Sequence, residues 1–350
     1  MRIEHIRQRL QALGALPCHE QRVLRAWTQR VSLDTRHRKA ENFLPLALRN
    51  ALPEITDLLA GLARIRSEHP GEDGSARLLV ELADQQCVES VLLPRDGLCV
   101  STQVSCAVGC VFCMTGRDGL LRQLGSAEIV AQVVLARALR PVKKVVFMGM
   151  GEPAHNLDNV LEAIDLLGNI AEIGHKNLVF STVGDPRVFE RLPLGVVKPA
   201  LALSLHTTRA DLRERLLPNA PRITPDELVE QGEIYARSTG YPIQYQWTLL
   251  EGINDSAEEM DGIVRLLSGK YAMMNLIPYN TTEGEGFRRP LAERAIALAK
   301  SLHSRRILTK LRNSAGQDID GGCGQLRARS QVQLEAKATR AEHIPLTLVR

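Results

Sequence analysis

The sequence lacks any run of about 18 apolar residues, the length that a membrane-spanning helix needs. Its first residues, MRIEHIRQRL, also lack the apolar stretch of a secretory signal. We therefore expect a cytoplasmic protein with no membrane partner. Aromatic residues make up only 4% of the chain, and no stacking platform for bases is visible, which weakens the case for a protein that only binds nucleic acid.

The composition is that of a folded, globular protein. Hydrophobic residues account for 44% of the 350 residues and charged residues for 24%. These values are typical of an ordinary soluble domain and exclude a disordered chain. The length suits one large α/β domain with a small appendage, or two ordinary domains.

Positive charge is concentrated near the N-terminus. The net charge is +4, yet residues 1–40 alone hold nine Lys or Arg side chains against three acidic ones. A basic segment on a near-neutral body favours a polyanionic partner. A solvated helical surface is the other interpretation, and the charge count alone is compatible with both.

The spacing of apolar residues predicts two kinds of structure along the chain. Residues 1–66 read as helical, residues 69–75 as a polar turn, and residues 76–83 and 87–94 as two strands of a hairpin. From residue 98 onward, six apolar runs predict strands, and amphipathic helices separate several of them, at 126–139, 157–168, 224–237 and 256–267. This alternation implies a parallel sheet, either a partial (β/α) barrel or a doubly wound sheet. In both, functional residues gather at the C-terminal ends of the strands.

Three of the seven cysteines fall within eight residues, as Cys106, Cys110 and Cys113 in a CxxxCxxC pattern. Such a cluster is not laid out as a disulfide framework and points to metal or redox chemistry. Thiolates are the usual ligands of iron–sulfur clusters, and three of them leave one iron open for a substrate. A zinc site completed by His206 or by another cysteine is the competing interpretation, because structural zinc takes four ligands.

CxxxCxxC with Phe112 before the last cysteine resembles the signature of the radical S-adenosylmethionine (SAM) superfamily. The resemblance implies one 4Fe–4S cluster on Cys106, Cys110 and Cys113, whose open iron binds SAM. Reductive cleavage of that SAM yields a 5′-deoxyadenosyl radical. The implied fold class is α/β, a partial (β/α)6 TIM-like barrel of the radical SAM type with a small helical N-terminal accessory domain. VVFMGMGEP, SLH and PYN, placed at strand ends, resemble further elements of the superfamily.

A narrower resemblance extends over residues 88–326. The segments VESVLLP, LCVSTQVSCAVGCVFC, GMGEP, FSTVG, LALSLH, NLIPYN and DIDGGCGQL occur in the order found in the RlmN/Cfr adenosine RNA methyltransferases. This resemblance implies that Cys323 carries the methyl group, that Cys99 is its resolving partner and that Glu89 accepts a proton. It assigns SAM contacts to Gly151, Glu152, Ser181, Ser204, Leu205, His206 and Asn280.

The chemistry explains why such residues are needed. Carbon 2 of adenine is electron-poor and has no lone pair, so ordinary methyl transfer to it has no workable route. In the family, one SAM methylates Cys323, because a thiolate is a good nucleophile. A second SAM, cleaved at the cluster, removes hydrogen from the S-methyl group, and the carbon radical adds to the ring. Glu89 takes the ring proton, and Cys99 displaces Cys323 as a transient disulfide.

The resemblance therefore implies a SAM-dependent RNA methyltransferase that modifies carbon 2 or carbon 8 of an adenosine, in 23S rRNA or tRNA. We expect a monomer that receives electrons from a donor such as flavodoxin. One alternative is a radical SAM enzyme of another reaction type, which the pair Cys99 and Cys323 disfavours. The other is a metal-stabilised, non-catalytic RNA-binding protein. Cys18 and Cys87 match nothing in the family pattern, and we interpret them as structural.

The predicted organisation has four parts. They are a helical accessory region that binds RNA (1–75), a short β-hairpin that carries Glu89 (76–97), the radical SAM partial barrel (98–326) and a C-terminal tail (327–350).

Overall fold

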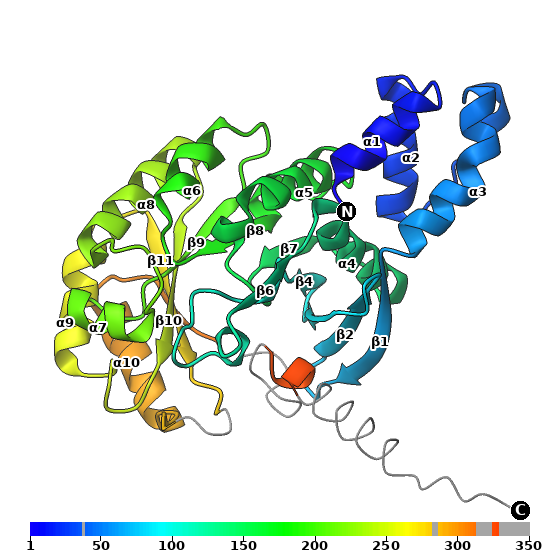
Figure 1. The fold of residues 1–350 in the computed structure, drawn as a ribbon. Helices are drawn as coiled ribbons and strands as arrows, with labels where there is room; N and C mark the ends of the chain where they lie inside the picture. The colour runs from blue at the N-terminus through cyan, green and yellow to red at the C-terminus, as the bar shows by residue number, and fades with distance from the viewer. Residues whose placement is uncertain (37–38, 282–285, 313–323, 329–350) are drawn as a thin grey trace, which may run out of the picture.

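The computed structural model describes residues 1–36, 39–281, 286–312 and 324–328 (Figure 1). Its α-helices are α1 (Ile3–Ala12), α2 (Pro17–Gln29), α3 (Leu46–Ala60), α4 (Ser126–Leu139), α5 (Leu157–Asn169), α6 (Pro186–Arg191), α7 (Ala210–Leu216), α8 (Pro225–Thr239), α9 (Ala257–Leu267) and α10 (Ala292–Ser304). Its strands are β1 (Ala63–Pro70), β2 (Ala76–Leu82), β3 (Cys87–Leu93), β4 (Gly97–Cys99), β5 (Gln103–Ser105), β6 (Leu120–Gln123), β7 (Lys144–Phe147), β8 (Leu178–Thr182), β9 (Ala200–Ser204), β10 (Ile243–Leu249), β11 (Ala272–Pro278) and β12 (Thr309–Leu311).

The strands form one large curved sheet, with β5 and β6 paired separately. Its order is β1-β2-β3-β4-β7-β8-β9-β10-β11-β12. Neighbours are antiparallel from β1 to β4 and parallel from β4 to β12. Helices connect the parallel strands on the outside of the curve (Figure 1). The predicted α/β partial barrel is therefore confirmed. The sequence pattern missed β12, which is only three residues long.

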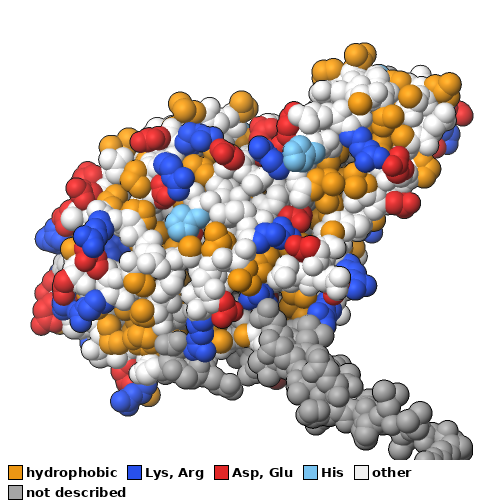
Figure 2. Space-filling model, viewed as in Figure 1, with side chains coloured by type: hydrophobic (Ala, Val, Ile, Leu, Met, Phe, Trp, Pro, Cys, Tyr) orange, Lys and Arg blue, Asp and Glu red, His pale blue; other side chains and the backbone are white. Residues whose placement is uncertain are grey.

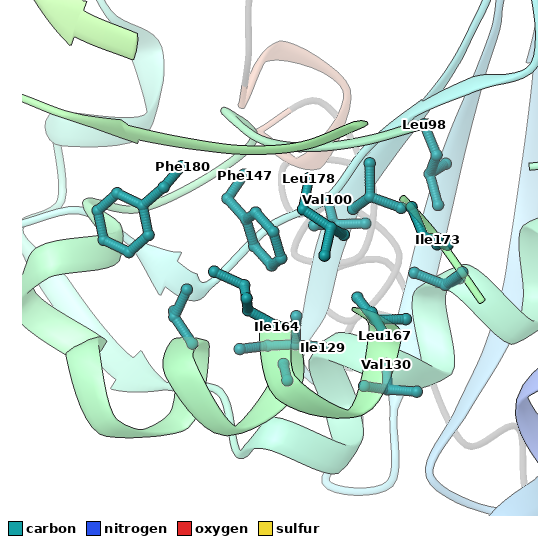
Figure 3. Close-up of a cluster of buried hydrophobic side chains, with 14 of the residues drawn as sticks. Leu98, Val100, Ile129, Val130, Phe147, Ile164, Leu167, Ile173, Leu178 and Phe180 are labelled. Carbon is teal, nitrogen blue, oxygen red and sulfur yellow. The ribbon is translucent and has the colours of Figure 1, made fainter. Parts of the chain in front are cut away.

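Successive side chains of the parallel strands point to opposite faces of the sheet, toward the helices outside or toward the barrel interior. One set of side chains points outward and is buried against α4 and α5. Figure 3 shows this cluster, with labels on Leu98, Val100, Ile129, Val130, Phe147, Ile164, Leu167, Ile173, Leu178 and Phe180. The intervening residues point into the barrel, where Val146, Val179 and Ala202 form a smaller apolar floor. Polar residues at the strand ends lie above that floor.

The N-terminal helices are anchored on α4. The Ile3 N–H donates to Ser126 Oγ (2.8 Å), and Arg137 Nη1 donates to the Thr28 carbonyl (2.7 Å). These contacts join both ends of the α1–α2 pair to the outer surface of the barrel. No helix in the described ranges is both long and apolar enough to cross a membrane.

The helical prediction for residues 1–66 is wrong at its end. Helix α3 stops at Ala60, and residues 63–70 form β1, which pairs antiparallel with β2. Of the predicted polar turn 69–75, residues 69 and 70 belong to β1, and residues 71–75 form the turn of this hairpin. Strand β1 takes its conformation from its pairing with β2, which a local apolar period does not reveal.

Candidate active site

The CxxxCxxC segment forms a loop directly after β5. The loop begins at Ser105 with a φ of 67°, and Ser105 Oγ donates to the Thr115 carbonyl (2.7 Å). That hydrogen bond ties the two ends of the loop together. Inside the loop, Gly109 also adopts positive φ, and Gly116 packs against it so closely that an added Cβ would lie 2.8 Å from Gly109 Cα. The backbone at this point therefore requires glycine.

A second segment supports the loop from behind. The Val111 N–H donates to the Leu216 carbonyl (3.1 Å) at the end of α7. Asn219 contributes two further hydrogen bonds: its N–H to the Val108 carbonyl (3.2 Å) and its Nδ2 to the Ala107 carbonyl (2.9 Å). Helix α7 and the turn after it thus fix the position of the cysteine loop.

A cavity of about 300 Å³ opens at the C-terminal ends of β7–β11, beside this loop. It is lined by nine of the side chains or backbone positions predicted from the sequence: Cys106, Cys110, Cys113, Gly151, Glu152, Ser181, Ser204, His206 and Asn280. Leu205 is buried in the apolar core and does not line the cavity. Glu89 and Cys99 lie near it but are not among the lining residues. Cys323 lies outside the described residues.

The three cysteines fit a cluster better than free thiols. Burial raises the pKa of Cys106 to about 12 and also raises the pKa values of Cys110 and Cys113. Bound metal reverses this cost, because a coordinating thiol gives up its proton. Among the described residues, no three His, Cys, Asp or Glu side chains are placed to hold a single ion. A 4Fe–4S cluster spaces its thiolates more widely than one zinc ion does, and three cysteines on one cavity wall suit it.

Glu152 is held in a buried carboxylate site at the turn after β7. Its Oε1 accepts from the Ala154 N–H (3.1 Å) and its Oε2 from the Val183 N–H (3.1 Å). Burial nevertheless raises the pKa of Glu152 to about 7. The preceding Gly151 has a φ of 102°, and an added Cβ would lie 2.6 Å from Gln103 Cβ. The turn aims a carboxylate into the cavity, where a ligand ammonium group would stabilise its charged form.

His206 is a neutral, fixed imidazole. Its Nδ1 accepts from the Thr248 N–H (3.0 Å), and its ring meets the Phe112 ring edge-on with centroids 4.9 Å apart. Burial lowers the pKa of His206 to about 3, and the nearby Arg213 charge adds to this effect. The free proton position is therefore Nε2. His206 itself has a φ of 60°, a conformation that the strand end imposes on it.

Gln246 is a cavity residue that the family motifs do not contain. Its Nε2 donates to the Gln244 carbonyl (2.9 Å), which fixes the orientation of the amide. Its buried Oε1 then faces the cavity with no hydrogen-bond partner among the described residues. An orphaned acceptor of this kind fits a polar ligand with a hydroxyl or amino donor, as SAM has. The alternation of IQYQWTLL places Gln246 and Thr248 on the inward side, and that signal could have identified both.

Glu89 lies on β3 beside the cavity and bridges two parts of the chain. Its Oε2 accepts from Arg77 Nη1 (2.9 Å), and its Oε1 accepts from the Arg327 N–H (2.9 Å). Burial raises the pKa of Glu89, while Arg77 and the backbone N–H groups of residues 324, 326 and 327 oppose that rise. Gly324 is pressed against Thr115, two residues beyond Cys113. The segment 324–328 is therefore docked between Glu89 and the cysteine loop.

Cys99 lies on the barrel floor at the end of β4. Burial raises the pKa of its thiol to about 11, and the charges of Arg77 and Arg312 act in the opposite direction. The negative charge of Glu89 contributes to the raised pKa values of both Cys99 and Cys113. The remaining described cysteines lie elsewhere: Cys18 is exposed on α2, and Cys87 is buried at the start of β3.

Comparison with known proteins agrees with this geometry. Residues 100–267 match the family model of the radical SAM superfamily. A solved radical SAM methyltransferase from Sphaerobacter thermophilus has a TM-score of 0.79 and 32% identity, covering 93% of this chain and 97% of that one. Fold and site together define a radical SAM enzyme.

Two curated relatives indicate more closely which radical SAM family the chain belongs to. A protein named "Probable RNA methyltransferase" from Azoarcus sp. (strain BH72) is 75% identical over 99% of this chain and 100% of its own length. Another of that name, from Leptothrix cholodnii, is 71% identical and covers 99% of both chains. The chain belongs to the family of radical SAM methyltransferases that these relatives represent.

Proposed function

We propose that the protein methylates carbon 2 or carbon 8 of an adenosine in RNA, through an S-methylcysteine at Cys323. The RNA is 23S rRNA or tRNA, and the enzyme acts in the cytoplasm as a monomer with an external electron donor such as flavodoxin. The names of relatives at 71–75% identity support RNA as the substrate. The fold shared with a radical SAM methyltransferase supports methyl transfer as the reaction. When bound, the cluster and SAM supply a carbon-centred radical.

The observation that carries this proposal is the position of Glu89. Its carboxylate accepts the Arg327 N–H, four residues after Cys323, and its charge reaches Cys99 and Cys113. One side chain thus binds the docked segment 324–328 and acts through its charge on the candidate resolving cysteine and on the cysteine loop. A methyl-carrying residue, a resolving thiol and a base have to meet around one ring carbon, and the position of Glu89 is consistent with this requirement.

Glu89 is suited to hold a proton taken from the ring. The Arg77 guanidinium and the backbone N–H groups favour its charged form, which is the form that can accept a proton. Burial raises its pKa and so favours keeping the proton once it is taken. Cys99 then forms a disulfide with Cys323. Before this step the ring loses its unpaired electron to the external electron carrier, which leaves a closed-shell thioether. The Cys99 thiolate attacks the Cys323 sulfur, and the electron pair of the broken carbon–sulfur bond stays with the product carbon, which takes up a proton to complete the methyl group.

The N-terminal region is our candidate RNA surface, although much of its positive charge is compensated. Arg2 pairs with Glu162, Arg9 with Glu54 and Arg25 with Glu172. Figure 2 shows basic and acidic side chains interspersed on the face in view. Arg7, Arg30 and Arg36 form no ion pair within the described ranges, so their charges remain available to phosphates.

Variants of Cys99 and Cys323 test the proposed mechanism, because each should block the reaction at a different step. Cys323→Ala should leave cluster assembly intact and give no methylated adenosine. Cys99→Ala should instead accumulate a covalent protein–RNA adduct that survives denaturing gels, since Cys99 acts only after the ring is bonded to Cys323. The adduct should disappear in the double variant.

Cys87→Ala is the matched control, because Cys87 is also a buried thiol on a neighbouring strand of the sheet. It should leave methylation unchanged. Mass spectrometry of nucleosides from rRNA and tRNA, with and without the enzyme, identifies the base and the carbon. Equal loss of stability in the Cys99 and Cys323 variants, without a crosslink, would contradict the mechanism.

A further inference from the structure

Arg213 is a buried cation in the apolar wall behind the cysteine loop. It lies on α7 and is only 3% exposed. Its neighbours on that helix, Leu212 and Leu216, belong to the apolar cluster that contains Cys106 and Val108. A guanidinium in such surroundings is costly unless an anion compensates it.

The described structure gives Arg213 one hydrogen bond and no carboxylate. Nη2 donates to the Val183 carbonyl, while Nε and Nη1 are buried and have no hydrogen-bond partner in the described ranges. No ion pair joins Arg213 to an acid anywhere in the described part of the chain. Glu152, whose charge acts on Arg213, has both carboxylate oxygens engaged by backbone N–H groups. The Nε and Nη1 groups of this buried cation therefore lack an acceptor among the described residues.

The groups whose charges act on Arg213 indicate which anion compensates its positive charge. Against the effect of burial, the charged forms of Cys110 and Glu152 favour the charged guanidinium, and both residues line the cavity of the candidate active site. Burial lowers the pKa of Arg213 to about 10, which still leaves the side chain charged at neutral pH. A 4Fe–4S cluster on three thiolates carries net negative charge, and reduction makes it one unit more negative. The same helix that carries Arg213 also supports the cysteine loop through Leu216.

We propose that Arg213 is the electrostatic partner of the cluster: its buried guanidinium stabilises the reduced state and raises the reduction potential of the cluster. Net charge, hydrogen bonds to sulfur and exclusion of solvent are the factors that set such potentials. Arg213 supplies a fixed positive charge in a wall where water does not screen it. It is thus a positioning residue for electron transfer, distinct from the SAM-binding side chains. The inference rests on family membership and not on the identity of the methylated base.

The test compares Arg213→Met with Arg213→Lys and with a control on the same helix. Arg215→Met is the control, because Arg215 is exposed and pairs only with Asp211 among the described residues. Each variant is reconstituted anaerobically, assayed for iron and titrated potentiometrically while the reduced cluster is followed by electron paramagnetic resonance. At the wild-type midpoint potential, the reduced-to-oxidised ratio of Arg213→Met should fall about tenfold, which corresponds to about 59 mV for one electron.

The other variants sharpen the result. Arg213→Lys keeps the charge and should retain most of the wild-type potential, and Arg215→Met should match wild type. SAM affinity, measured by its effect on the resonance spectrum, should stay unchanged in Arg213→Met. An unchanged potential in Arg213→Met, or a loss of SAM affinity without a shift in potential, overturns the proposal.

A second measurement keeps the proposal testable if Arg213→Met loads iron poorly. Without the cluster, Arg213 is an uncompensated cation, and replacing a buried charge with an apolar side chain is often neutral or stabilising. Cluster-free Arg213→Met should therefore unfold in urea at the wild-type midpoint or above it. A markedly lower midpoint would make Arg213 a structural residue of α7 and would overturn the electrostatic role.

Discussion

Arg77 and Glu89 form a buried ion pair on neighbouring strands, with Arg77 Nη1 2.9 Å from Glu89 Oε2 and each side chain 3% exposed. In the register of the β2–β3 pair, Arg77 lies opposite Val91 and Glu89 lies opposite Leu79, so the two side chains are diagonal neighbours across the strands. The other oxygen of Glu89 accepts the Arg327 N–H. The pair therefore links the first hairpin of the sheet to the segment that follows Cys323.

Removing one partner of this ion pair should lower the stability of the folded protein. Arg77→Met leaves a buried carboxylate without its cation, and we expect the free energy of unfolding to fall by about 3–5 kcal/mol. The pKa of Glu89 should rise further, so methylation should drop at neutral pH while iron content is kept. Arg64→Met is the control, because Arg64 pairs with Glu81 but is 75% exposed, and should cost less than about 1 kcal/mol. Equal costs in urea unfolding would contradict this ranking.

Much of the fold and most of the residues of the candidate active-site cavity could be predicted from sequence. The apolar period identified α4, whose bounds match the predicted 126–139, although the helix is buried on most of its surface and is not amphipathic as predicted. Nine predicted site residues line one cavity because the C-terminal ends of parallel strands meet at one edge of the sheet.

What sequence reasoning missed depends on distant contacts. Strand β1 exists through its pairing with β2, and β12 through its pairing with β11. Arg213 lies in ADLRERL, which reads as a surface helix, and no local period shows that this arginine faces inward. The partners of Glu89 are likewise far away in sequence, since Arg327 is 238 residues from it.

The contact between Gly116 and Gly109 should control cluster assembly. An alanine Cβ at position 116 would lie 2.8 Å from Gly109 Cα, so the cysteine loop would have to move. We expect Gly116→Ala to lower iron content several-fold in reconstituted protein. Gly174→Ala is the control, because its added Cβ would come no closer than 3.7 Å to a flexible side chain. Full iron content in Gly116→Ala, by colorimetric assay and absorbance, would show that the loop tolerates the shift.

RNA binding should depend on the unpaired arginines of the N-terminal region. Replacing Arg7, Arg30 and Arg36 together with Gln should weaken RNA binding and lower the slope of log affinity against log salt by roughly 2. The control is the double variant Arg25→Gln/Glu172→Gln, which removes a cation with its anion and leaves net charge unchanged. Fluorescence anisotropy at several salt concentrations measures both. An unchanged slope in the triple variant would place the RNA surface elsewhere.

The buried, neutral state of His206 predicts a pH-dependent stability. Its pKa is lowered from 6.5 to about 3 in the folded protein, so below pH 6.5 the unfolded chain takes up a proton that the folded chain does not. Stability from this residue is thus fully present above pH 6.5 and is lost as pH falls toward 3. Asn is the best replacement, because it tolerates the φ of 60° and its Oδ1 can accept the Thr248 N–H.

Relative to wild type, cluster-free His206→Asn should gain about 2 kcal/mol in free energy of unfolding between about pH 6.5 and pH 5, since each pH unit corresponds to about 1.4 kcal/mol. Urea unfolding across this range gives the two slopes. His303→Asn, at an exposed position on α10, should leave the slope of the wild type unchanged. Parallel pH profiles for wild type and His206→Asn would mean that the folded protein binds a proton at His206. In that case the imidazole would enter the cavity as a cation, and it could no longer present a neutral Nε2–H to a ligand.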